Sequence, residues 1–135
     1  MKVIISLLLI SLMVSCNSEN KQMDGQVTDI IKLSTHSVSF ESQSGKRTVE
    51  TEGQHWTFES FCESETYKCI SIIEDNGNLS EGFTYDWISI RRVSNRAMEV
   101  SVLENKGIAR KIVVCISMGD FFDYLLIEQK ENVVQ

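Results

Sequence analysis

The clearest alternation of apolar and polar positions lies near the C-terminus, between residues 110 and 129. Apolar side chains occupy every second position in its first half: Ile112, Val114, Ile116 and Met118. An extended strand places all four on one face. Gly119-Asp120 then forms a two-residue turn with glycine first, as a type II′ hairpin requires, and the chain returns through residues 124–127. The pattern predicts a β-hairpin, which needs a facing sheet because one hairpin alone is not stable in water.

Shorter runs of the same kind precede the hairpin, separated by turn residues such as Gly45, Gly53 and residues 75–78. Six further segments are predicted as strands: residues 37–40, 47–52, 55–61, 69–73, 87–90 and 98–102. No stretch keeps a 3.6-residue apolar period long enough for a helix. The fold class predicted is therefore all-β, an antiparallel β-sandwich of seven to eight strands.

The N-terminus has the composition of an export signal. Lys2 is followed by a twelve-residue apolar run from Val3 to Val14. A membrane-spanning helix needs about 20 apolar residues, so this run has instead the length of a signal-peptide core. The segment Leu-Met-Val-Ser-Cys at residues 12–16 resembles the bacterial lipobox. That resemblance implies cleavage after Ser15 and lipid modification of Cys16. The alternative is an ordinary secretory signal with a chance cysteine.

Three regions follow from this reading of the N-terminus. Residues 1–15 are expected to be the lipoprotein signal peptide, residues 16–29 a polar, flexible tether, and residues 30–135 the sandwich domain. The expected location is the cell envelope, with a membrane contact made through the lipid anchor. Each buried CH₂ group of an acyl chain contributes about 0.8 kcal/mol to such an anchor.

A set of residues spread through the domain occurs in the order typical of one family. They are Val38-Ser39-Phe40, Gly45, Thr48-Val49, Trp56, Asp86-Trp87-Ile88-Ser89-Ile90, Val100, Asn105, Arg110 and Ile127-Glu128-Gln129. This order resembles the BACON family, an immunoglobulin-like bacterial module associated with carbohydrate-active proteins. The resemblance covers residues 33–130. It implies an immunoglobulin-like sandwich, carbohydrate or glycoprotein binding, and the outer membrane of a Gram-negative bacterium.

Two departures from that family pattern stand out. Residues 91–95 replace the usual Pro and Gly after the second tryptophan strand, and the connection between Trp56 and Trp87 is longer than usual. Its extra stretch, residues 62–85, is expected to form an added hairpin or a long loop.

The charge balance excludes one class of partner. Thirteen Lys and Arg residues face 19 Asp and Glu residues, which gives a formal net charge of -6. Nucleic-acid binding needs clustered basic side chains that release phosphate counterions, so no nucleic-acid partner is expected.

The cysteines suggest a disulfide, because exported proteins mature where disulfides form. Cys62 and Cys69 flank a short acidic segment and are a possible pair that closes a small loop. Pairing of Cys115 with either of them stays open, since sequence does not settle connectivity. The simpler interpretation of Cys115 is a small buried apolar residue. No histidine lies near Cys62 and Cys69, so no metal site is expected there.

The sequence contains no recognisable catalytic motif. His36 and His55 are the two histidines, and neither accompanies a nucleophile elbow or a reactive-cysteine signature. Glu63, Glu65 and Glu81 are interpreted as a solvated acidic loop. The chain is therefore expected to be neither an enzyme nor a cofactor-binding protein.

Aromatic side chains are the remaining candidates for binding. Trp56 and Trp87 lie in alternating strands and are expected in the core, with Phe58 on the same side as Trp56 and Thr57 on the opposite side. The residues expected to bind glycan are those of the long connection: Tyr67, Phe83 and Tyr85. The alternative for these rings is cover for a core edge, and Phe121 and Phe122 beside the hairpin turn are further candidates. The function expected is a non-enzymatic binding module for glycan or glycoprotein, with a structural spacer or protein-partner module as the alternative.

Overall fold

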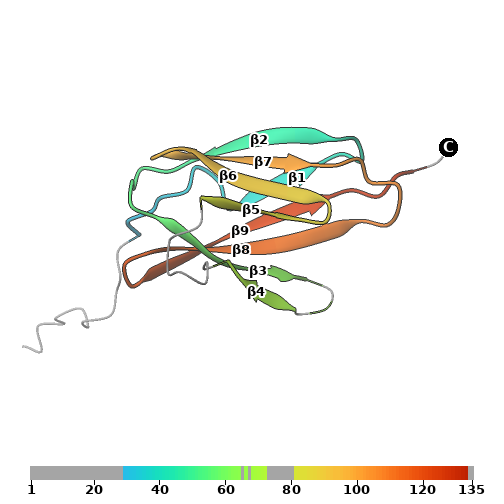
Figure 1. The fold of residues 1–135 in the computed structure, drawn as a ribbon. Helices are drawn as coiled ribbons and strands as arrows, with labels where there is room; N and C mark the ends of the chain where they lie inside the picture. The colour runs from blue at the N-terminus through green and yellow to red at the C-terminus, as the bar shows by residue number, and fades with distance from the viewer. Residues whose placement is uncertain (1–28, 65, 67, 73–80, 134–135) are drawn as a thin grey trace, which may run out of the picture.

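The computed structural model describes residues 29–64, 66, 68–72 and 81–133, and in this part of the chain nine strands form two packed sheets (Figure 1). The strands are β1 (Ser37–Phe40), β2 (Gly45–Glu50), β3 (Thr57–Glu63), β4 (Cys69–Ser71), β5 (Gly82–Tyr85), β6 (Ile88–Ser94), β7 (Ala97–Val102), β8 (Arg110–Met118) and β9 (Phe121–Gln129). The predicted all-β sandwich is confirmed. The described residues contain no helix long and apolar enough to span a membrane.

One sheet has the strand order β1-β9-β8-β3-β4, and the other has β2-β7-β6-β5. All neighbouring strands pair antiparallel except β1 and β9, which run parallel with Ser37 opposite Leu126 and Phe40 opposite Gln129. The predicted antiparallel pairing is therefore confirmed for the other strand pairs, and β1 with β9 is the parallel exception. The short strand β1 covers the edge that β9 would otherwise present and is itself the edge strand of this sheet.

The count of nine strands corrects the prediction of seven to eight. The additional strand is β5, in a stretch that was expected to be a loop or an added hairpin. The β4 segment does form a hairpin-like pair with β3, whereas β5 pairs with β6 in the other sheet. The physical reason is that Phe83 and Tyr85 recur at alternate positions, so an extended chain turns both rings toward the core.

The predicted hairpin of residues 110–129 is confirmed as β8 and β9, with Met118 opposite Phe121. Gly119 has a φ of +59°, and Asp120 does not have a positive φ. A positive φ at the first central position alone is the type II′ pattern. Three of the four alternating apolar side chains of β8 are fully buried: Ile112, Val114 and Ile116.

Both tryptophans lie in the core, as predicted, with exposed fractions of 1% for Trp56 and 8% for Trp87. Trp56 Nε1 donates a 3.0 Å hydrogen bond to the Asn95 carbonyl, and the Arg92 guanidinium lies 3.7 Å from the centre of a Trp56 ring. Thr57, expected on the opposite side, is also buried. The register of β3 then shifts between Phe58 and Ser60, where a bulge interrupts the alternation.

Three polar residues of the family-like pattern meet at one end of the sandwich. Arg110 Nε donates a 3.0 Å hydrogen bond to Gln129 Oε1, and Gln129 Nε2 donates to the Leu103 carbonyl at 2.8 Å. The Arg110 guanidinium also lies 4.6 Å from the centre of a Trp87 ring. The buried Asn105 amide donates to two backbone carbonyls of the flanking segments. These side chains satisfy buried polar groups where β8 begins and β9 ends.

Candidate functional site

Of the three aromatic residues that the sequence predicted to bind glycan, two lie in the described part of the chain. Tyr67 lies outside the described residues. Phe83 and Tyr85 lie on β5, where they are half-buried against the core. The Phe83 ring stacks on Phe61 with centroids 4.6 Å apart, and the Tyr85 ring lies 4.8 Å from the Phe61 ring. These two rings therefore cover the edge of the core, the alternative that the sequence left open.

Two other rings are exposed on the outer surface of the sandwich. Phe122 and Tyr124 are 53% and 58% exposed and lie two residues apart on β9. Residues two apart in a strand point to the same side, and the intervening Asp123 points to the other. Phe121, the remaining candidate beside the turn, is partly buried and packs against the core. Of the rings beside the hairpin turn, Phe122 and Tyr124 are thus the pair exposed to solvent.

Polar groups of β8 and β3 lie beside these rings. Ser117 pairs with Phe122 across the sheet, and Cys115 pairs with Tyr124. Directly opposite residues of an antiparallel pair share one face. Ser117 Oγ donates a hydrogen bond to a carboxylate oxygen of Glu59, which lies on β3. The outer face of β3, β8 and β9 therefore combines two exposed rings with the half-buried Glu59 carboxylate, which the buried Ser117 hydroxyl orients.

The Cys115 thiol on this face is half-buried. Its burial raises the pKa of the thiol above its ordinary value, and the negative charge of Glu59 adds to the rise. Hydrogen bonds with Tyr124 and Ser60 act in the opposite direction and offset part of it. Because the thiolate is the reactive form, Cys115 is a weak nucleophile in this position.

The predicted disulfide between Cys62 and Cys69 is present, where the two residues lie opposite each other on β3 and β4. Cys115 has a free thiol. The open question of connectivity among the three cysteines is thereby answered in favour of the short loop. Since Cys62 is the cross-strand partner of Val113, the disulfide joins the same outer face as Cys115.

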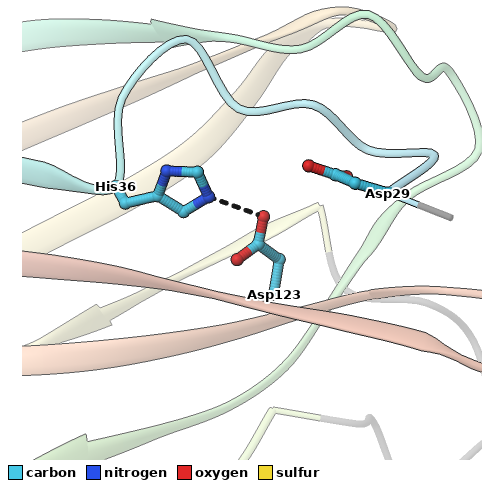
Figure 2. Close-up of side chains that lie close together, drawn as sticks. All are labelled: Asp29, His36 and Asp123. Carbon is cyan, nitrogen blue, oxygen red and sulfur yellow. Dashed lines mark hydrogen bonds and ion pairs between the residues drawn. The ribbon is translucent and has the colours of Figure 1, made fainter. Parts of the chain in front are cut away.

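A second group of chemically capable side chains lies at the end of the sandwich near the β8–β9 turn. Asp29, His36 and Asp123 each direct a potential ligand atom toward the others, and these atoms all lie within 4.8 Å of one another (Figure 2). His36 Nε2 and Asp123 Oδ2 are 2.9 Å apart. We refer to these three residues as the Asp-His-Asp cluster.

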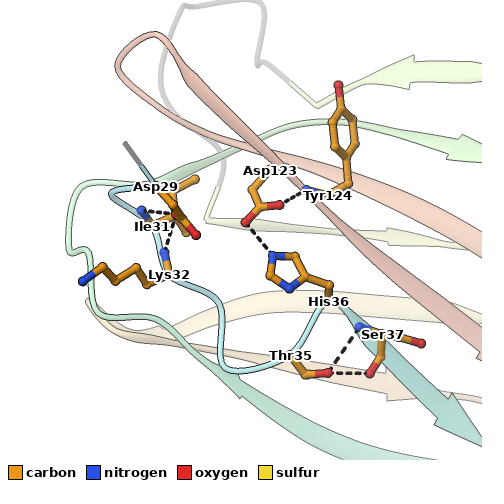
Figure 3. A network of polar contacts seen from close by, with 8 residues as sticks. All are labelled: Asp29, Ile31, Lys32, Thr35, His36, Ser37, Asp123 and Tyr124. Atoms are coloured by element: carbon orange, nitrogen blue, oxygen red, sulfur yellow. Dashed lines mark hydrogen bonds and ion pairs between the residues drawn. The ribbon is translucent and has the colours of Figure 1, made fainter. Parts of the chain in front are cut away.

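Backbone amide groups orient both carboxylates of the cluster (Figure 3). Asp29 Oδ1 accepts hydrogen bonds from the amides of Ile31 and Lys32 at 3.0 and 2.8 Å. Asp123 Oδ1 accepts one from the Tyr124 amide at 2.8 Å. Each carboxylate is thereby held by one oxygen, and Asp123 turns its other oxygen to His36.

Sequence reasoning did not single out this cluster. His36 was weighed only as a base for catalysis, and Asp29 and Asp123 were not considered. Asp123 is 87 residues from His36, and the two meet because β1 pairs with β9. No local motif signals a site assembled by a pairing of this kind. The one available sign was a histidine directly before a predicted strand.

Comparison with known proteins establishes the fold and nothing further. No family model matches the chain, and no curated protein matches it either. A protein from Bacteroides thetaiotaomicron, solved by NMR, is similar over 83% of this chain and 96% of its own, with a TM-score of 0.65 and 16% sequence identity. An endo-fucoidan hydrolase of glycoside hydrolase family 107 aligns with 81% of this chain but only 14% of its own length, with a TM-score of 0.47 and 10% identity.

Proposed function

We propose that this protein is a non-enzymatic binding module of the cell envelope that holds a carbohydrate or glycoprotein on the outer face of β3, β8 and β9. The observation that carries the proposal is the exposed pair Phe122 and Tyr124, which stand on one side of one strand. Aromatic rings held in the open at a protein surface offer flat apolar area for contact. Pyranose rings have apolar faces that stack on such surfaces.

The surroundings of the pair suit a ligand rich in hydroxyl groups. The half-buried Glu59 carboxylate accepts a hydrogen bond from Ser117 and has a second oxygen that accepts one from a ligand hydroxyl. The Ser117 hydroxyl is itself buried, so it orients Glu59 and does not contact the ligand. Because β8 and β9 are paired along nine residues each, their side chains are held on a rigid scaffold. A rigid face loses little conformational entropy when it binds.

The location is proposed from sequence alone. A lipid on Cys16 and a tether over residues 16–29 attach the domain to the outer membrane of a Gram-negative cell. Residues 1–28 lie outside the described part of the chain, which begins at Asp29. The BACON-like assignment likewise stays a prediction, and it is consistent with a β-sandwich.

A binding experiment tests the proposal directly. The purified full chain, kept in detergent, is screened against a broad panel of plant and host glycans, and hits are titrated by calorimetry. Phe122→Ala and Tyr124→Ala are each expected to weaken binding at least tenfold. Val93→Ala is the control, because Val93 is an exposed apolar side chain on β6 of the other sheet. Saturable binding that neither aromatic substitution changes would overturn the assignment of the face.

If no glycan of the panel binds, the result favours the alternative function, a structural spacer or protein-partner module. A single stoichiometric partner recovered by pull-down, and lost with Phe122→Ala, identifies the same face as a protein interface. Replacing Phe122 or Tyr124 is expected to leave the fold unchanged, because both side chains are exposed.

A further inference from the structure

We propose that the Asp-His-Asp cluster, Asp29, His36 and Asp123, binds a divalent transition-metal ion, and that Zn²⁺ is the ion that its chemistry fits best. The cluster offers one imidazole nitrogen and two carboxylate oxygens. Nitrogen and oxygen donors of these types are the usual ligands of Zn²⁺, and imidazole distinguishes such a site from the all-oxygen sites of Ca²⁺ and Mg²⁺. This site is separate from the outer face and does not depend on the proposed function.

The spacing of the donors agrees with metal coordination. Ligand atoms bound about 2.1 Å from Zn²⁺ lie about 3 to 3.5 Å from one another in octahedral or tetrahedral arrangements. His36 Nε2 and Asp123 Oδ2 are 2.9 Å apart, and all three ligand atoms lie within 4.8 Å (Figure 2). Small side-chain rotations therefore bring the three donors around one ion without a change of backbone. Water molecules complete the coordination of an ion at a site with three protein ligands.

The hydrogen bonds around the cluster also favour coordination. Outer hydrogen-bond partners that fix the orientation of ligands are a regular part of metal sites. Backbone amides bind Oδ1 of Asp29 and of Asp123, as Figure 3 shows. Among the described residues, Asp29 Oδ2 has no hydrogen-bond partner, and Asp123 Oδ2 contacts only His36. Asp29 Oδ2 is thus available to an ion, and a bound ion would replace the hydrogen bond between His36 Nε2 and Asp123 Oδ2, with release of its proton.

Within the described part of the chain, no Lys or Arg forms an ion pair with the carboxylates of the cluster. Two carboxylates meet one imidazole, and the neighbouring cation Lys32 makes its ion pair with Glu52, at 3.0 Å. Asp123 is well covered, with 14% of its side chain exposed, so its charge is less screened by water than that of a surface carboxylate. A bound divalent cation removes this excess negative charge.

An ion in this position joins two distant parts of the chain. Asp29 and His36 belong to the segment that leads into β1, whereas Asp123 lies on β9. The ion therefore fixes the entry of the chain into the domain against the last strand. Because the ion binds the folded state, it is expected to raise the thermal unfolding midpoint as its concentration rises.

Titration of the full chain with ZnCl₂ tests the site, by calorimetry and by NMR of the histidine rings. We expect one saturable equivalent of Zn²⁺, a shift of the His36 ring signals and no shift of the His55 signals. His36→Ala, Asp29→Asn and Asp123→Asn are each expected to weaken binding at least about tenfold. His55→Ala is the matched control, since His55 is the other exposed histidine of the chain and is expected to leave the affinity unchanged.

Two outcomes overturn the site. One is the absence of saturable binding, and the other is binding of equal affinity in His36→Ala and in the unaltered chain. Each variant is first checked by thermal unfolding, and the NMR titration of the unaltered chain gives an independent answer if a variant fails to fold. Ring signals of His55 that move together with those of His36 would reveal nonspecific surface binding, which also contradicts the proposal.

Discussion

The Tyr85 hydroxyl donates a 2.6 Å hydrogen bond to Glu63 Oε1 and so joins the edge strand β5 of one sheet to the end of β3 in the other. The Thr66 hydroxyl donates to the second carboxylate oxygen at 2.8 Å. The hydrogen bond from Tyr85, followed by that from Thr66, lowers the pKa of Glu63. The same bond to Glu63 raises the pKa of Tyr85. The two sheets are therefore linked at this edge by a hydrogen bond that depends on the protonation state of Glu63.

Tyr85→Phe removes the hydroxyl and keeps the ring on Phe61. The pKa of Glu63 is expected to rise toward its ordinary value, as measured by NMR titration of its side-chain carboxyl carbon. Since the folded pKa of Glu63 is lowered, its contribution to stability is present above the unfolded pKa and is lost as the pH falls through the folded pKa. The acid side of the stability profile should accordingly flatten in the variant. An unchanged Glu63 titration in Tyr85→Phe would contradict the assigned cause.

The raised pKa of Cys115 predicts slow alkylation of this thiol in the folded protein. The thiolate is the reacting species, and burial followed by the charge of Glu59 disfavours it. The rate of reaction with iodoacetamide should stay low at neutral pH and increase only above the ordinary range of a cysteine thiol. Alkylation in denaturant is the control, and it should be fast. Equal rates in the folded and unfolded chain would show that Cys115 is accessible and ionised.

The disulfide between Cys62 and Cys69 should contribute measurably to stability. It closes a loop with a sequence separation of seven residues. A loop of this size predicts a loss of about 2–3 kcal/mol when both cysteines are replaced by alanine. Urea unfolding of the double variant measures the loss, and the double replacement avoids leaving a new free thiol. A loss below about 1 kcal/mol would mean that β3 and β4 are held together by their pairing alone.

Trp87→Ala is expected to cost about 3–5 kcal/mol, because the ring lies in the core and supports the Arg110 guanidinium. Phe122→Ala is the contrasting substitution and should change the free energy of unfolding by less than about 1 kcal/mol, since its ring is mostly exposed. Chemical denaturation of both variants gives the comparison. Similar losses for the two would contradict the assignment of one ring to the core and the other to the surface.

The parts of the fold that sequence predicted are those set by local pattern. Alternation places Ile112, Val114 and Ile116 on one face, and glycine at position 119 permits the positive φ of the turn. The parallel pairing of β1 with β9 joins segments about 90 residues apart, and nothing in the four residues of β1 specifies its partner. The Asp-His-Asp cluster depends on that pairing and was missed for the same reason.

The family resemblance drew attention to three polar residues but did not explain what they do in the fold. Asn105, Arg110 and Gln129 were noted only for their order in the chain. In the structure they donate hydrogen bonds to backbone carbonyl groups at the end of the sandwich where β8 begins, and these bonds satisfy the buried side chains of Asn105 and Gln129. The exposed pair on β9 was missed in part, because Phe122 was noted beside the turn, whereas Tyr124 was interpreted only as part of the returning strand.

The parallel pairing of β1 and β9 has a mechanical consequence. The chain enters β1 at one end of the pair and leaves β9 at the opposite end, as Figure 1 shows. A pulling force applied through these two segments acts along the strands, so the hydrogen bonds of the pair bear the load together rather than one after another. A force that pulls the segment before β1 away from the segment after β9 would therefore be resisted first by the pairing of these two strands.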